Sequence, residues 1–263
     1  MTRAQTIIKY VAFAVAALLI VGIFTGVGEL LSHLFDDKTP GEVKEYQISD
    51  GVSELDIDIG AAEMRIVMSD TLYIESNLRN LTVEERGGKL KIEEKTLFGT
   101  NGNDTYLTLY IPDGYTFTNL DIDAGAGRLT AEKLSAERLS LTLGAGEVVI
   151  GELTVSASAE IEGGAGALKI ESGRIAGLDI EMGAGALTMT ASLVGKCEID
   201  QGVGEIDLTL VGDINDYCIT ANKGIGDIII NESQISTGAV IGTGENKIEL
   251  NGGIGKIVVK TKK

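Results

Sequence analysis

Apolar and polar residues alternate with a period of two on both sides of a glycine tripeptide that recurs through the second half of the chain. The residues five and three positions before the tripeptide are Leu120 and Ile122, Leu139 and Leu141, Ala159 and Ile161, Leu178 and Ile180, and Cys197 and Ile199. The residues two and four positions after it are Val148 and Ile150, Leu168 and Ile170, Leu187 and Met189, Ile206 and Leu208, and Ile228 and Ile230. Such alternation is typical of a strand with one buried face. Each unit is therefore predicted to contain two strands joined at the tripeptide.

The tripeptide Gly-x-Gly sets the length of the unit, because its first glycines lie 19, 20, 19, 19 and 22 residues apart. The predicted corner residues are Gly125 and Gly127, Gly144 and Gly146, Gly164 and Gly166, Gly183 and Gly185, Gly202 and Gly204, and Gly224 and Gly226. Glycine lets the backbone bend sharply beside a packed core, and the small residue between the two glycines is expected to point inward. A unit this short buries its apolar face only against neighbouring units. We therefore predict an all-β fold, a parallel β-solenoid (β-helix) that is right-handed like most parallel crossovers.

Two rival explanations of the glycine pattern are disfavoured. A dinucleotide-binding fingerprint requires a third glycine and a following helix, whereas here strand-like alternation follows every tripeptide. Helical repeats require a 3.6-residue period, and this region shows none.

The two ends of the repeat region depart from the pattern. A degenerate copy covers 55–62, and strand-like runs follow at 71–75, 80–85, 89–95 and 105–111. We interpret 42–118 as a β-rich cap of antiparallel hairpins that includes this degenerate first repeat, and 119–263 as the regular solenoid. At the far end, Gly242-Thr243-Gly244 and Gly253-Ile254-Gly255 lie only 11 residues apart, which predicts an irregular terminal coil that closes the exposed edge.

The N-terminus contains a candidate membrane anchor. Residues 10–28 are 19 residues without a charge, which span about 28 Å as a helix and match a bilayer core. Arg3 and Lys9 precede this stretch, so the positive-inside rule predicts a cytoplasmic segment at 1–9, a transmembrane helix at 10–28 and a juxtamembrane linker at 29–41. The β domain is then extracytoplasmic in a single-pass membrane protein. A cleaved signal peptide is the alternative, although no small-residue cleavage site follows.

The charge of the chain restricts its partners. The formal net charge is −17, which opposes binding to nucleic acid and to anionic lipid head groups. The two cysteines, Cys197 and Cys218, allow one disulfide between neighbouring coils. The alternative is that they are two small buried side chains.

Acidic residues occupy the outward positions just before several tripeptides. They are Glu160 and Glu162, Asp179 and Glu181, and Glu198 and Asp200, and stacking would align them in an acidic ladder. Unit charges about 5 Å apart repel by about 1 kcal/mol in water, so the ladder suggests a counter-cation, for which calcium is the natural candidate. The alternative is a solvated face that keeps the edge from associating.

Signals for catalysis are weak. The single histidine, His33, lies near the candidate anchor, the chain has no tryptophan, and aromatic residues make up 5% of it. Asp179 and Glu181 are the one candidate acid/base pair for polysaccharide cleavage. We predict no catalytic residues, no enzyme activity and no cofactor, with calcium as the exception to be tested.

Several segments together resemble a known family. The run LTLYIPDG at 107–114 precedes LDIDAGAGRL, LSLTLGAGEVVI, IEGGAGALKI and IEMGAGALTM, and this order resembles the bacterial putative-adhesin family of β-strand-repeat domains of unknown function. The resemblance implies an exported or membrane-attached β-solenoid that acts in adhesion or in envelope-stress signalling, and it carries no known binding residues. We predict a non-enzymatic binding or scaffold module of the cell envelope whose partner is an envelope protein or a surface polymer. The alternatives are a calcium-binding structural solenoid and, more distantly, a polysaccharide-active enzyme.

Overall fold

The computed structural model describes residues 40–60, 62–94 and 104–262. The predicted cytoplasmic segment, the predicted transmembrane helix and all but the last two residues of the predicted linker lie outside these ranges. Within them, no helix is long and apolar enough to cross a membrane. The described chain consists of strands together with one short 3-10 helix, η1 (Ile214–Asp216).

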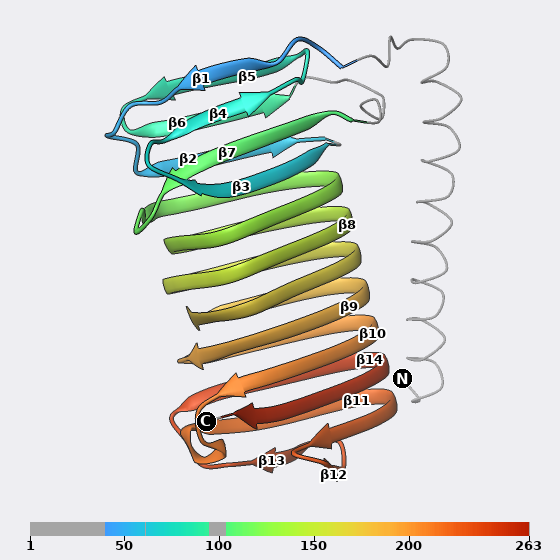
Figure 1. Ribbon diagram of the computed structural model, residues 1–263. Coiled ribbons are helices and arrows are strands. Elements are labelled where there is room, and N and C mark those ends of the chain that lie inside the picture. The colour runs from blue at the N-terminus through green and yellow to red at the C-terminus, as the bar shows by residue number, and fades with distance from the viewer. Residues whose placement is uncertain (1–39, 61, 95–103, 263) are drawn as a thin grey trace, which may run out of the picture.

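The second half of the chain winds into coils that stack in parallel as a solenoid-like repeat (Figure 1). The coils are formed by β8 (Phe117–Ala176), β9 (Leu178–Val194), β10 (Lys196–Val211), β11 (Tyr217–Ile230) and β14 (Asn246–Lys262). The register stacks like on like, since Gly166 pairs with Gly185 and Gly185 with Gly204. The Gly-x-Gly corners therefore form one edge of the molecule.

Apolar side chains fill the interior of every coil. All residues of the two predicted inward columns are buried, which confirms the alternation read from the sequence. A third inward pair was missed, represented by Leu153 and Val155 and by Ala191 and Leu193. In one coil this pair follows a shift of phase, because Leu153 lies three positions after Ile150, whereas Ala191 continues the alternation two positions after Met189.

The residues between the corner glycines contradict one expectation. None of the described middle residues is fully buried. Ile225 is 46% exposed, whereas Ala145, Ala165, Ala184 and Val203 are half-buried.

The described residues of the cap form seven short strands. They are β1 (Lys44–Gln47), β2 (Glu54–Ile59), β3 (Glu63–Ser69), β4 (Tyr73–Ser76), β5 (Leu81–Arg86), β6 (Lys89–Glu94) and β7 (Tyr106–Pro112). The expected antiparallel pairing holds for β5 with β6, β4 with β7, and β1 with β4. By contrast, β2 and β3 pair in parallel with β8 on one side and with β6 and β7 on the other. The degenerate first repeat thus lies between the other strands of the cap and the regular coils.

The C-terminal end is also ordered differently from the prediction. Strand β14 does not form an irregular terminal coil, because it lies between β10 and β11 and pairs in parallel with both. Its inward residues Ile248, Leu250, Ile257 and Val259 are buried and repeat the columns of an ordinary coil. The outer edge of β11 is instead covered by the short antiparallel strands β12 (Ser233–Gln234) and β13 (Ala239–Ile241).

The inserted strand also separates the two cysteines. Cys197 pairs in register with Ile248 of β14, whereas Cys218 pairs with Lys247 on the other side of that strand. Both thiols are free. The disulfide between Cys197 and Cys218, which the sequence allowed as one of two alternatives, is therefore not formed in the structure.

Candidate functional site

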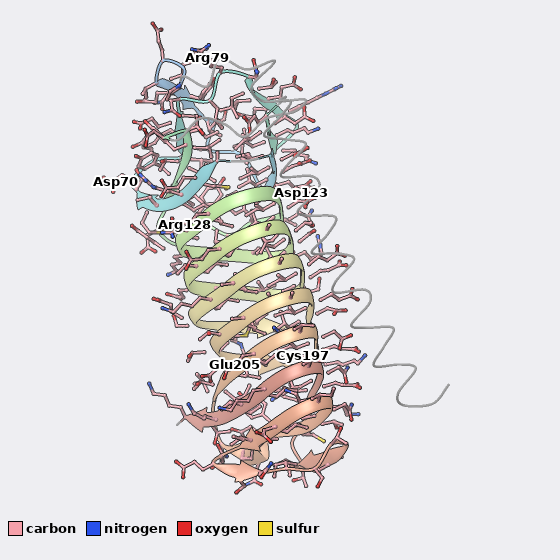
Figure 2. All side chains as sticks on the ribbon, turned by 90° about the vertical axis from the view of Figure 1, so that its right-hand side faces the viewer. Asp70, Arg79, Asp123, Arg128, Cys197 and Glu205 are labelled. Carbon is pink, nitrogen blue, oxygen red and sulfur yellow. The ribbon has the colours of Figure 1, made fainter. Side chains whose placement is uncertain are left out.

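A groove of about 1040 Å³ runs along the coils beside the Gly-x-Gly corners. Figure 2 looks onto the corner edge, where Asp123 and Cys197, which precede a corner, lie on one side and Arg128 and Glu205, which follow a corner, lie on the other. The groove lies on the side of Asp123, because it is lined by residues that precede the corners. It extends from Thr142 in β8 to Asn222 in β11.

Glycines form the floor of the groove because the stacked corners have no room for side chains. Gly164, Gly183, Gly202, Gly253 and Gly224 all line it. At the second glycine of each corner the backbone adopts a positive φ, for instance 141° in Gly185. A Cβ at any of these floor positions would come within 3.0 Å of a carbonyl oxygen in the adjacent coil. The floor is therefore bare backbone that a ligand can approach closely.

One wall of the groove is acidic. Glu162, Glu181 and Asp200 occupy equivalent positions in consecutive coils, in direct register, and all three line the groove. Adjacent strands lie about 4.8 Å apart, so these carboxylates are close neighbours. No described residue forms an ion pair with Glu162 or Glu181.

The acidic wall continues into a pair of amides. Asn251 takes the equivalent position in β14 and donates a hydrogen bond from Nδ2 to Asp200 Oδ1 at 2.7 Å. Asn222 in β11 donates in turn to Asn251 Oδ1 at 3.0 Å. The Asn251 amide therefore satisfies part of the hydrogen-bonding capacity of the Asp200 carboxylate, whereas no such amide of a described residue donates to Glu162 or Glu181.

The other half of the predicted acidic ladder forms a second row outside the groove. Glu160, Asp179 and Glu198 are also in register, and Glu198 forms an ion pair with Lys196 at 3.2 Å. In the part of the chain that the structure describes, no group of three or more acidic, histidine or cysteine residues is placed to hold a metal ion. The calcium hypothesis stays a prediction without a preformed site, and Asp179 and Glu181 share a strand but not the groove.

Two inward polar residues in the groove were not found by sequence reasoning. Gln201 is 5% exposed, and its Nε2 donates to the carbonyl oxygen of Gly185 at 2.6 Å. Its Oε1 is buried with no hydrogen-bond partner. Lys223 occupies the same position in β11, where burial lowers its pKa while Asp227 and Glu205 oppose that shift. Both residues directly precede a Gly-x-Gly corner, a position that was not aligned.

The family follows from the match between the chain and known sequence patterns. Residues 52–260 match the model for Toastrack DUF4097 domains. The chain belongs to this family. Toastrack DUF4097 is a domain family of unknown function, which agrees with the resemblance seen in the sequence. No curated protein matches the chain.

Several solved structures are similar to this Toastrack chain. A putative cell adhesion protein from Clostridium sporogenes is 16% identical, with a TM-score of 0.38, and the match covers 85% of this chain and 100% of that one. A putative adhesin from Bacteroides fragilis is 15% identical, with a TM-score of 0.37, and the match covers 83% and 96% of the two chains. A putative lipid binding protein from Parabacteroides distasonis is 15% identical, with a TM-score of 0.30 and coverage of 84% and 96%.

Proposed function

We propose that this Toastrack protein is a non-enzymatic binding module of the bacterial cell envelope, anchored in the membrane by residues 10–28 and with its β domain outside the cytoplasm. Adhesion and envelope-stress signalling are the two roles that such a module serves. The groove is the observation that carries the binding function. It combines a bare glycine floor with a row of carboxylates and amides.

The lining of the groove supports binding more than catalysis. It contains no histidine, cysteine or serine, so a Ser–His or Cys–His pair of nucleophile and base is absent from it.

The anchoring part of the proposal rests on the sequence. The 19 uncharged residues at 10–28 follow Arg3 and Lys9, and this order directs the chain after the helix out of the cytoplasm. A reporter that is active only outside the cytoplasm, fused after Lys263, should therefore be active. The same reporter fused after Lys9 should be silent and serves as the control.

The opposite pattern would overturn the proposal. If the fusion after Lys263 is intact but silent, and a cytoplasmic reporter at the same place is active, the β domain faces the cytoplasm and adhesion is ruled out. If the first pattern holds, cross-linking in intact cells separates the two roles. Capture of a membrane sensor protein favours signalling, and binding of cells to surface polymers favours adhesion.

A further inference from the structure

We propose that the groove binds an extended, lysine- or arginine-rich segment of a partner polypeptide. This inference rests on the proposed function, because it names the ligand of the same groove. The unmatched groups in the groove are the starting point. Glu162 and Glu181 line it without an ion pair among the described residues, and Gln201 has a buried oxygen without a donor.

All three of these groups accept hydrogen bonds. A buried acceptor without a partner destabilises the protein, and stacked like charges repel one another. A ligand that brings several hydrogen-bond donors and positive charge would relieve both costs. Ammonium and guanidinium groups supply donors and charge together.

The length of the groove points to a polymer. Its outward row passes from Thr142 through Glu162, Glu181, Asp200 and Asn251 to Asn222, one residue per coil. At about 4.8 Å per step the five steps cover about 24 Å, which is the length of about seven residues of extended chain. A single cation would occupy one or two of these steps and leave the rest of the row unmatched.

The two ends of the groove differ, which gives the ligand a direction. Lys223 lines the end near β11 and opposes positive charge there, so the basic side chains belong over Glu162, Glu181 and Asp200. At that same β11 end of the row, Asn251 and Asn222 offer amide groups to the ligand backbone. Ile254 and Ile225 beside them offer an apolar contact.

The composition of the lining favours a polypeptide over a glycan. No aromatic residue lines the groove, whereas an aromatic ring is the usual platform for a sugar. Long flexible lysine and arginine side chains also tolerate the difference between the carboxylate spacing of about 4.8 Å and the peptide repeat of about 6.6 Å. The test must therefore distinguish a polypeptide ligand from an uncharged oligosaccharide.

The test uses the full-length protein in detergent micelles and a fluorescent octapeptide of alternating lysine and serine. Binding is followed by fluorescence anisotropy at low salt. The comparison ligands are the octapeptide of alternating glutamate and serine and a neutral oligosaccharide. We expect the lysine peptide to bind and the two comparison ligands not to bind.

Two double variants make the test specific for the groove. Glu162→Gln with Glu181→Gln removes two charges from the wall, and Glu160→Gln with Asp179→Asn removes two charges from the same coils outside the groove. The first pair should weaken binding about tenfold or more, which corresponds to about 1.4 kcal/mol. The second pair should weaken it less than about threefold, because its two residues lie outside the groove. A third variant, Gln201→Met, should weaken binding while the protein stays folded by circular dichroism.

Three results would overturn the inference: no binding of the lysine peptide, equal loss in the two double variants, or equal binding of the neutral oligosaccharide. None of these results bears on the reporter experiment, so a failure of the lysine peptide to bind would leave the proposed location of the β domain outside the cytoplasm intact. Conversely, a silent reporter after Lys263 with peptide binding intact would reject the location and keep the ligand.

Discussion

Replacing one corner glycine by alanine tests whether the stack of corners holds the fold together. In Gly185 two separate costs coincide. Its φ of 141° is unfavourable for alanine, and the new Cβ would collide with the carbonyl oxygen of Gly166 in the next coil. Two other glycines separate these costs. Gly195 has a φ of 80° with nothing within 4 Å of a Cβ, whereas a Cβ at Gly183 would lie 2.6 Å from Gly164 O without a positive φ.

The magnitudes follow from these geometries. A left-handed conformation costs a non-glycine residue about 1–2 kcal/mol, which is the full effect expected for Gly195→Ala. Overpacking costs about 1–3 kcal/mol, and Gly183→Ala should show this effect alone. Gly185→Ala should cost about 4 kcal/mol, because its obstacle is backbone that cannot rotate away.

The assay is thermal unfolding followed by far-ultraviolet circular dichroism. For a domain of this size about 1 kcal/mol lowers Tm by about 2–4 °C. We therefore expect a loss of about 2–8 °C for Gly195→Ala and about 8–16 °C for Gly185→Ala. If Gly185→Ala melts no lower than Gly195→Ala, the corners do not carry the close contacts described here.

Three further predictions concern the cysteines and the charges. Cys218 should react with an alkylating reagent well before Cys197, because burial raises the pKa of the Cys197 thiol; mass spectrometry under non-reducing conditions should find no bond between them. Asp58→Asn should raise Tm at pH 7, because burial and the nearby Asp123 raise the pKa of Asp58 above its ordinary value of 3.8. The folded protein then holds this proton more tightly than the unfolded chain, so stability falls as pH rises through the shifted pKa and the gain should vanish below pH 3.8. Added calcium should change Tm by no more than about 1 °C. A specific calcium site would instead add about 2.7 kcal/mol of stability at a calcium concentration of 100 times its Kd, so a larger rise in Tm would support the calcium hypothesis.

The parts of the fold that depend on local pattern could be predicted from the sequence. Alternation around each tripeptide identifies the inward residues, because burial of one face is a property of a single strand. The order of the coils could not be predicted this way. The tripeptide at 253–255 has the same flanking columns as those at 202–204 and 224–226, so no local signal indicates that it lies between them.

The groove was only partly predictable for the same reason. Its acidic wall is visible in the sequence at Glu162, Glu181 and Asp200. The continuation into Asn251 and Asn222 becomes visible only once the register of β14 is known. Gln201 had one signal, since it is a polar residue in an inward column, but its unpaired oxygen depends on contacts between coils.

The interior position of β14 has a consequence for how the chain is made. Strands β10 and β11 do not pair with each other, because β14 lies between them and pairs with both. Synthesis proceeds from the N-terminus at about 5–20 residues per second, so β11 emerges before the strand that must separate it from β10. The last coils therefore assemble only after β14 has been synthesised. Until then the facing edges of β10 and β11 must stay apart, and their pairing with each other is the most direct route to a misfolded protein.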